Sequence, residues 1–359
     1  MLLVVNAGSS SLKLAVFDAQ LQAVLSGSVS EIGVRARIRI GNVDHQMPVV
    51  DHNAALNVAL GIIEQAGYPV AMFTAAAHRV VHGGPHLTAA CKITPDTLAQ
   101  ITACVPLAPL HNPANLLAIH ALAKLAPALP QYASFDTAFH ATNPDLATTY
   151  ALPADIRALG FRRYGFHGLS YAGLVKTLRY QMDGQLPHRL LALHLGNGAS
   201  LCAIRDGVSV ATTMGYSPLD GLTMGTRAGG IDGNAVLGLA TLHGIDGAAD
   251  ILNRRSGLMG LGGSSDMRDL HTARTPDARF AIDHFCYWAA RHAGSMMVAM
   301  GGVDAVAFTG GIGEHDMVVR GAIADRLAWA VAGLPVFTVP AAEERQIASE
   351  AAAVQQAEQ

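Results

Sequence analysis

The stretch LLVVNAGSSSLKLAVFD, residues 2–18, places two short apolar runs on either side of an Asn, a Gly and three Ser. Apolar runs of this length are typical of buried β-strands, and the small residues between them predict a tight turn. Two further runs, AVLSGSVS and ARIRIG, follow before residue 45. The start of the chain is therefore predicted to form successive antiparallel strands.

The same pattern returns in RLLALHLGNGASLCAIRDGVSVATT, residues 189–213. Each strand set is followed by helical patterns and then by one more strand. The first of these later strands, QYASFD, ends at Asp136, and the second, in VDAVAFTGGIGEHD, ends in a Gly-rich loop. No strict sequence repeat is present, but the order of elements repeats.

This order predicts an α/β protein of two lobes. We expect helices at 51–67, 94–104, 114–126, 274–300 and 341–357. The predicted boundaries are residues 1–137 with 346–359 for the N-terminal lobe and 138–345 for the C-terminal lobe, with a hinge near 137–150.

Composition excludes several classes of protein. With 359 residues, about two domains are expected, and 51% hydrophobic residues predict a large buried interior. No apolar run approaches the roughly 20 residues of a membrane helix. A signal peptide has a basic segment before its apolar segment, and no such segment precedes the first apolar run here. A net charge of −3 argues against a nucleic-acid binder, and four scattered cysteines indicate a reducing compartment, the cytoplasm.

Three small-residue loops could bind phosphate: NAGSSSLK (6–13), LHLGNGAS (193–200) and FTGGIGE (308–314). Small residues let backbone N–H groups approach an anion, and Lys13 adds positive charge. None of the loops matches a P-loop or a dinucleotide-binding motif. Each alone is compatible with a plain β-turn, but three such loops after buried strands favour a nucleotide.

Cationic and imidazole side chains stand in Gly- or Pro-rich segments. These are Arg79, His111, His167 and Arg227. Fixed Arg and His donors stabilise the charge that spreads over a phosphoryl group during transfer. The alternative from residue type alone is that Arg79 and Arg227 form salt bridges at a domain interface.

Asp136 is the best acidic candidate, because it ends a buried strand where an ionised group needs a partner. For Glu314, Glu343 and Glu344 the residue type alone favours a solvated carboxylate at a helix start over a metal ligand. Asp266 and Arg268, in SSDMRD, suit either a ribose and adenine neighbourhood or a plain helix cap.

Taken together, these segments resemble the acetokinase family of the acetate and sugar kinase/Hsc70/actin superfamily. The resemblance spans nearly the whole chain, in the order NAGSSSLK, HRVVHGG, APLHNPAN, FDTAFH, YGFHG, HLGNGAS, MGYSPLDGLTMGTR, SGLMG, SSDMRD and FTGGIGE. It implies two actin-like, ribonuclease H-like lobes, each a mixed sheet flanked by helices, with the active site in the cleft between them.

The activity implied is reversible, direct in-line transfer of the γ-phosphoryl group of ATP to acetate, giving acetyl phosphate and ADP. The expected cofactor is Mg²⁺, with Mn²⁺ as an alternative. The resemblance also implies a cytoplasmic homodimer that binds neither nucleic acid nor membrane, with dimerisation through the C-terminal lobe.

The resemblance further implies a role for each matching residue. The catalytic residues would be Arg79, Asp136, His167 and Arg227, and Asn6 and Glu343 would bind the metal. Ser9, Ser11 and His111 would contact the phosphoryl group, and Arg79, Val81, Leu110, Phe166 and Pro218 would bind the acyl substrate. ATP would contact Lys13, His194, Leu195, Gly196, Asn197, Gly198, Asp266, Met267, Arg268, Gly310, Gly311, Ile312 and Gly313.

The chain also departs from the family's motifs. Leu169 and Tyr171 replace a Thr and a His, and Gly230 and Gly233 replace an acidic residue and a Pro. A surface segment between His315 and Pro340 is expected to be trimmed. These departures leave open a propionate or other short-chain acyl kinase. An actin-like nucleotide switch without transfer chemistry is a further alternative, but it would not need Arg79, His167 and Arg227 together.

Overall fold

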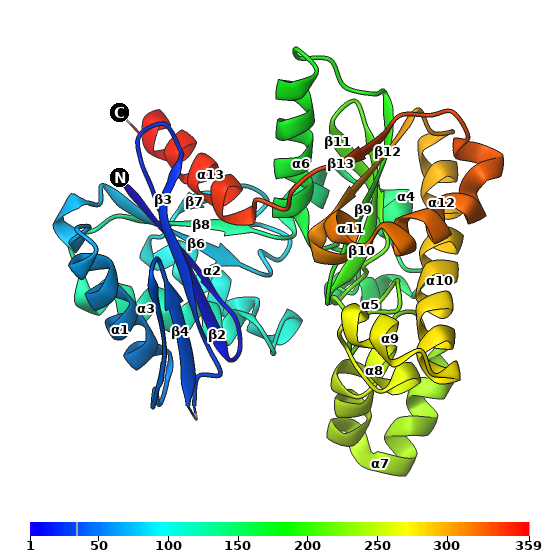
Figure 1. Cartoon of the computed structure of the whole chain (residues 1–359), viewed down its shortest axis with the longest axis horizontal. Coiled ribbons are helices and arrows are strands. Elements are labelled where there is room, and N and C mark those ends of the chain that lie inside the picture. The colour runs from blue at the N-terminus through cyan, green and yellow to red at the C-terminus, as the bar shows by residue number, and fades with distance from the viewer. Residues whose placement is uncertain (34, 359) are drawn as a thin grey trace. The chain divides into compact units, whose positions relative to one another are not determined.

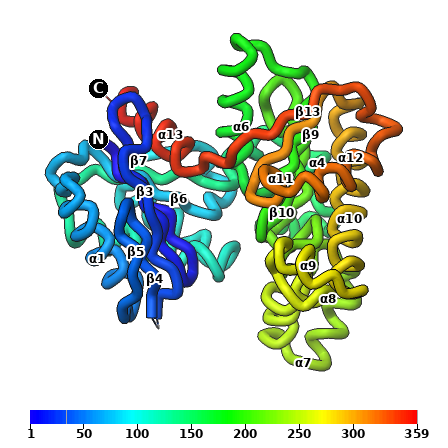
Figure 2. The backbone as a smooth tube through the Cα atoms, in the orientation of Figure 1, coloured from blue at the N-terminus to red at the C-terminus, as the bar shows by residue number. Residues whose placement is uncertain are grey.

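The computed structural model describes residues 1–33 and 35–358. The chain forms two compact units, and the boundaries between them fall after Ala138 and before Ala342. Unit 1 contains Met1–Ala138 and Ala342–Gln359, and unit 2 contains Phe139–Ala341 (Figure 1). Both chain ends belong to unit 1, because the last helix returns to it (Figure 2).

Unit 1 is built on an eight-stranded mixed sheet with the order β5-β4-β3-β2-β1-β6-β8-β7. Strands β1 to β5 pair antiparallel in sequence order, and β6 and β8 continue the sheet parallel to β1. The strands are β1 (Leu2–Ala7), β2 (Ser11–Phe17), β3 (Ala23–Ser30), β4 (Ala36–Ile40), β5 (Val43–Met47), β6 (Ala75–Val80), β7 (Cys91–Lys92) and β8 (Gln131–Phe135).

Helices cover both faces of this sheet. Leu3 and Val5 of β1 join the core formed with α1 (His52–Gln65) and α3 (Asn112–Leu125). Side chains alternate between the two faces along a strand, so Asn6 points the other way, toward α13 (Glu343–Ala357). This alternation places a polar side chain of β1 beside the start of α13.

Unit 2 contains a five-stranded mixed sheet with the order β11-β10-β9-β12-β13. Its strands are β9 (Arg189–Leu195), β10 (Ala199–Arg205), β11 (Val208–Thr212), β12 (Ala305–Thr309) and β13 (Val336–Thr338). Strands β9 to β11 pair antiparallel, and β12 and β13 continue in parallel. The strands β3-β2-β1-β6-β8 of unit 1 have this same order, so the predicted repeat of the architecture is confirmed.

The core of unit 2 includes the helix α6 (Gly168–Gln181), whose Tyr171, Leu174 and Leu178 pack on β9, β10 and β12. Helix α10 (Pro276–Met300) also lies against β10 and β11. The other helices of the chain are α2 (Pro95–Ala103), α4 (Asp145–Thr148), α5 (Ala154–Ala158), α7 (Gly233–Arg254), α8 (Gly257–Gly262), α9 (Met267–Ala273), α11 (Gly310–His315) and α12 (Met317–Val331). Short 3₁₀ turns lie at Val70–Met72, Val105–Leu107 and Ala138–Thr142.

The five expected helices are found as α1, α2, α3, α10 and α13. The sequence reading assigned no element to α6, α7 or α12. Helix α12 and strand β13 occupy the segment His315–Pro340. The prediction of a Gly-rich loop after β12 is wrong, because α11 begins directly at Gly310 with Thr309 as its N-cap residue.

Helix α7 bears on the expectation about membrane spans. By length and composition it is, in the described part of the chain, the one helix that could cross a membrane. Its apolar residues are interrupted by His243, Asp246 and Asp250, so it contains no continuous apolar run of about 20 residues. Gly244 has non-helical angles, φ 73° and ψ 167°, and divides α7 into two shorter pieces. Each piece falls well short of the roughly 20 residues that span a bilayer.

Candidate active site

The turn between β1 and β2 brings together several predicted residues of unit 1. Asn6 and Lys13 are direct partners across the β1–β2 ladder, so their side chains lie on the same sheet face. Ser11 lies two residues before Lys13 and shares this face. Ser9 lies at the exposed tip of the turn.

The turn itself is held by groups from neighbouring elements. The Gly8 N–H donates to the Ser11 carbonyl at 2.8 Å, and His52 Nε2 lies 2.7 Å from the Gly8 carbonyl. The Asn115 side chain donates to the Ala7 carbonyl at 2.7 Å. This segment is therefore a braced turn rather than a loose surface loop.

Arg79 and Asp136 form a buried ion pair at the ends of β6 and β8. Arg79 Nη2 donates to Asp136 Oδ2 at 2.6 Å, and Arg79 Nε donates to Asp136 Oδ1 at 3.0 Å. Arg79 Nη1 also donates to the Asn6 side-chain oxygen at 3.2 Å. Asp136 is 2% exposed, so this pairing supplies the partner that its burial requires.

Burial and pairing act in opposite directions on these two groups. Burial raises the pKa of Asp136, while the charge and hydrogen bonds of Arg79 oppose that rise. Burial alone lowers the pKa of Arg79, but the charge and hydrogen bond of Asp136 outweigh it, so the Arg79 pKa is raised. The two-point contact with a permanently charged guanidinium keeps the carboxylate of Asp136 ionised at neutral pH.

Two glutamates open α13 beside this pair. Asn6 Nδ2 donates to Glu344 Oε1 at 3.4 Å, whereas Glu343 acts on Arg79 and Asp136 through its charge. The sequence comparison singled out Glu343, and the structure adds Glu344 as the glutamate that contacts Asn6.

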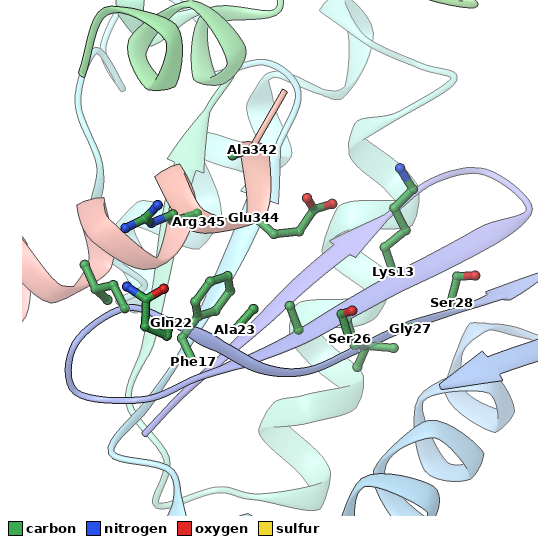
Figure 3. A pocket seen from close by; sticks show the side chains of 13 residues that line it. Lys13, Phe17, Gln22, Ala23, Ser26, Gly27, Ser28, Ala342, Glu344 and Arg345 are labelled. Atoms are coloured by element: carbon green, nitrogen blue, oxygen red, sulfur yellow. The ribbon is translucent and has the colours of Figure 1, made fainter. Parts of the chain in front are cut away.

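Glu344 also borders an open pocket of about 660 Å³ within unit 1. Lys13 of β2 and Arg345 of α13 line the same pocket, together with Ser26 and Ser28 of β3. In Figure 3 the Glu344 carboxylate extends from α13 toward the side where Lys13 rises from β2. The pocket is therefore bordered by one carboxylate, that of Glu344, and by the cationic side chains of Lys13 and Arg345.

The oxygen donors of unit 1 fit a hard divalent cation. Within residues 1–33 and 35–358, no group of three or more His, Cys, Asp or Glu side chains is placed to hold a metal ion. Mg²⁺ does not require such a group, because it usually takes one or two carboxylates and completes its shell with water and phosphate oxygens. Glu343, Glu344 and Asn6 offer carboxylate and amide oxygens of this kind.

The segment after β6 is braced by asparagines that the sequence reading did not assign. Asn115 accepts from the Val81 N–H, and Asn112 both accepts from the His82 N–H and donates to the His82 carbonyl, all at 3.0–3.1 Å. Both amides are buried in the first turn of α3. Their spacing of three residues in HNPAN, which places them on one helix face, was the signal available in the sequence.

Among the predicted acyl-pocket and phosphoryl residues of unit 1, Val81 is buried at 4% exposure and Leu110 is 43% exposed. His111 is the N-cap residue of α3 and is close enough to Asp136 for its charge to lower the Asp136 pKa.

In unit 2, two predicted histidines stack on one another. The rings of His167 and His194 lie 4.2 Å apart with an angle of 26° between their planes. His194 Nδ1 lies 2.8 Å from Ser170 Oγ, and His167 Nδ1 lies 2.9 Å from Ser200 Oγ. The two serines are buried, and the sequence reading assigned neither a role.

The second Gly-rich segment lies against this histidine pair. A Cβ atom on Gly198 would come within 2.9 Å of Arg227 Nη2 and 3.0 Å of His167 Nε2. The Asn197 carbonyl accepts from the Gly225 N–H at 2.9 Å, and Arg227 Nη1 donates to the Pro218 carbonyl at 2.6 Å. The structure therefore brings His167, His194, Gly198 and Arg227 together. Phe166, next to His167, is 1% exposed.

The residues expected near adenosine form two local structures in unit 2. Asp266 caps α9 by accepting from the Arg268 N–H at 2.9 Å, and its carboxylate pairs with the Arg268 side chain at 2.5 Å. This pairing lowers the pKa of Asp266 to about 2. Met267, the next residue, is buried.

The second local structure is α11, which begins directly after β12 and contains Gly310, Gly311, Ile312 and Gly313. Leu195 and Gly196 lead out of β9, where a Cβ on Gly310 would meet the Leu195 carbonyl at 2.7 Å.

Comparison with known proteins decides the family. Residues 1–353 match the model of the acetokinase family. The chain belongs to this family. It is 42% identical to an acetate kinase of Nitrobacter hamburgensis, over 97% of this chain and 94% of that protein. It is 43% identical to an acetate kinase of Rhodopseudomonas palustris, over 91% of this chain and 86% of that protein.

Solved structures of family members have the same fold. The Porphyromonas gingivalis acetate kinase matches with a TM-score of 0.89 at 32% identity, over 99% of both chains. A propionate kinase from Francisella tularensis matches with a TM-score of 0.92 at 31% identity, over 97% of this chain and 98% of that chain. The expected α/β fold of two mixed sheets flanked by helices is confirmed.

Proposed function

We propose that this acetokinase-family protein transfers the γ-phosphoryl group of ATP reversibly to acetate, giving acetyl phosphate and ADP. The observation that carries the proposal is the Arg79–Asp136 pair, which fixes a guanidinium beside Asn6, Glu343 and Glu344. Fixed cationic donors beside metal-type oxygen ligands are what phosphoryl transfer requires.

A carboxylate oxygen of acetate attacks the γ-phosphorus while the bond from that phosphorus to the β–γ bridging oxygen breaks. ADP leaves with the electron pair of that bond. Acetate is already ionised at neutral pH, so no general base is needed. This explains why the assigned groups are mainly arginine and histidine.

The side chains of the two units act on different parts of the reactants. In unit 1, Arg79 orients the acetate carboxylate, with Val81 and Leu110 around its methyl group. Ser9, Ser11, Lys13 and His111 contact phosphate oxygens. In unit 2, His167, His194 and Arg227 donate hydrogen bonds to the transferring phosphoryl group, and Phe166 and Pro218 bound the acyl group.

Unit 2 also binds the rest of ATP. Leu195, Gly196, Asn197 and Gly198 follow the phosphates, and the adenosine contacts are Asp266, Met267, Arg268 and residues 310–313. Asn6 and Glu343 hold the divalent cation, Mg²⁺ or Mn²⁺. When bound, this cation neutralises charge on the ATP phosphates.

The test is to incubate the purified protein with ATP, Mg²⁺ and acetate and to trap the acyl phosphate as its hydroxamate. We expect hydroxamate that depends on all three reactants. An absence of product with every short-chain acid, from folded protein, would instead support a nucleotide switch without transfer chemistry.

Propionate is a second candidate acceptor, because the structural match to a propionate kinase is at least as good as that to the acetate kinase. One methylene in an apolar pocket changes the binding free energy by only about 1–3 kcal/mol. Comparison of kcat/KM for acetate, propionate and butyrate decides between the two.

We also propose a cytoplasmic homodimer that associates through unit 2. Helix α7 supports this, because Ala248 and Leu252 are its buried residues although many of its side chains are apolar. Leu237, Leu242 and Ile245 are 65%, 78% and 80% exposed there. A second copy would remove this surface from water. Analytical ultracentrifugation tests the dimer, and Leu242→Glu with Ile245→Glu should shift it to monomer.

A further inference from the structure

We propose that Tyr171 and Ser200 are positioning residues that hold His167 as a neutral imidazole with its proton on Nε2. The inference rests on the proposed function, in which His167 donates a hydrogen bond to the phosphoryl group. The inference gives a role to Tyr171, which departs from the family's motif, and to Ser200, which had no assigned role.

The three side chains form a continuous chain of short contacts within unit 2. Tyr171 Oη lies 2.6 Å from Ser200 Oγ, and Ser200 Oγ lies 2.9 Å from His167 Nδ1. Tyr171 and Ser200 are both 0% exposed, so bulk water does not compete for these contacts. Ser200 thus bridges the phenol and the imidazole.

Both rings reach this one serine from the start of α6. Tyr171 lies in the first turn of the helix, and its N–H donates to the His167 carbonyl at 3.1 Å. His167 is the N-cap residue and has a left-handed rather than a helical backbone. The contacts of both side chains with Ser200 place them together at β10.

Proton accounting sets the direction of the chain. A phenol is a much stronger acid than an aliphatic alcohol, so the Tyr171 hydroxyl is the donor at the 2.6 Å contact and Ser200 Oγ accepts. The single proton of Ser200 is then directed to His167 Nδ1, which must accept it. An imidazole that accepts at Nδ1 and is neutral carries its proton on Nε2.

Burial keeps the first donor in place. It raises the pKa of Tyr171 well above its usual value, so the phenol does not ionise in the physiological range. The ring of His194, stacked at 4.2 Å, and the guanidinium of Arg227, also beside Gly198, are the titratable and charged groups nearest His167. A positive charge on the Arg227 guanidinium or on the His194 ring disfavours protonation of the His167 ring to an imidazolium.

The backbone next to His167 is also held in place. The φ of His167 is +59°, and Gly165, two residues earlier, has φ +80°. His140 Nε2 lies 2.9 Å from the Phe166 carbonyl, and a Cβ on Gly165 would come within 2.7 Å of the His140 ring. His140 thus fixes the main chain beside His167, while Ser200 contacts its Nδ1.

Two variants test the inference: Tyr171→Phe removes only the phenol oxygen, and Ser200→Ala removes the bridge. We expect kcat to fall about threefold to tenfold in Tyr171→Phe and tenfold or more in Ser200→Ala. The KM for acetate should stay within about twofold in both. The double variant should be no slower than Ser200→Ala, because the two residues act through one chain. Tyr132→Phe, which removes the phenol oxygen that donates to Glu358 in unit 1, is the matched control and should leave kcat unchanged.

A spectroscopic readout separates this inference from the proposed function. Nitrogen-15 labelled histidine spectra distinguish the two neutral tautomers, and His167→Asn identifies the His167 signals by their loss. We expect the Nε2–H tautomer in the wild type and a mixture in Ser200→Ala. An Nδ1–H tautomer in the wild type, or a tautomer unchanged in both variants, would overturn the inference. Full activity of His167→Asn would refute its catalytic role, while the same spectra still decide the tautomer.

Discussion

Arg79 and Asp136 join through two parallel hydrogen bonds, of 2.6 and 3.0 Å, although 57 residues separate them in the sequence. The pair closes the ends of two neighbouring parallel strands, β6 and β8. It gives the buried carboxylate a partner and fixes the guanidinium for the reaction at the same time.

Asp136→Asn should therefore lower both stability and activity. It removes the charge that pairs with a guanidinium only 21% exposed, which should cost a few kcal/mol, at most about 3–5, of the free energy of unfolding. Urea denaturation measures this, and the hydroxamate assay should show at least a hundredfold loss of kcat. Asp44→Asn is the control, because its pair with Arg37 is about half exposed and should contribute little to stability. Equal losses of stability in the two variants would contradict the expectation.

Gly198→Ala should impair activity but not folding. The new methyl group would meet the ends of Arg227 and His167, at 2.9 and 3.0 Å, and both side chains can move aside. We expect at least a tenfold fall in kcat with a melting temperature close to that of the wild type. Gly294→Ala in α10 of the same unit is the matched control, since a Cβ there would meet no atom within 4 Å and neither glycine has a positive φ. If both variants keep full activity, the positions of Arg227 and His167 beside Gly198 are not needed for catalysis.

Arg227→Ala should lower kcat at least tenfold and change the free energy of unfolding by less than about 1 kcal/mol. Arg227 is half-buried, and its Nη1 donates to the Pro218 carbonyl at 2.6 Å. Arg255→Ala, at an exposed arginine of the same unit, should leave turnover unchanged. Near-normal turnover of Arg227→Ala would remove this residue from the catalytic set.

Glu343→Gln should raise the Mg²⁺ concentration needed for half-maximal activity by about tenfold, because it removes one proposed carboxylate ligand. Glu344→Gln keeps an oxygen next to Asn6 and should have a smaller effect. Activity titrated against Mg²⁺ separates the two glutamates. A larger effect of Glu344→Gln would transfer the metal role to Glu344.

Stability should fall as the pH is lowered from about 6.5 to about 4. Burial lowers the pKa of His78 and of His140 to about 4 in the folded protein. An unfolded histidine has a pKa near 6.5, so between these values the unfolded state binds more protons and is favoured. Each histidine can contribute up to about 3 kcal/mol to this loss.

Denaturation at several pH values checks this dependence. His78→Gln keeps a donor for Gln131 but cannot titrate, and it should make the pH dependence shallower. His86→Asn, at an exposed position, should leave the slope as it is. A slope unchanged by His78→Gln would contradict the assignment.

The sequence by itself determined the antiparallel strands that open each unit, the repeat of the order of elements, and the family. These features depend on short-range patterns, such as the alternation in residues 2–18 and the small residues of the turns. Helix α7 escaped this reading because its apolar residues do not form one core-facing stripe and Gly244 interrupts it.

Only the tertiary structure decided which polar groups meet. Asn6 reaches Glu344 across 338 residues, and Ser200 of β10 contacts both Tyr171 of α6 and the N-cap residue His167. No local periodicity encodes such pairs, because they depend on how sheets and helices pack. Burial makes these contacts necessary for stability, because a buried carboxylate or hydroxyl must find its hydrogen-bond partner inside the fold.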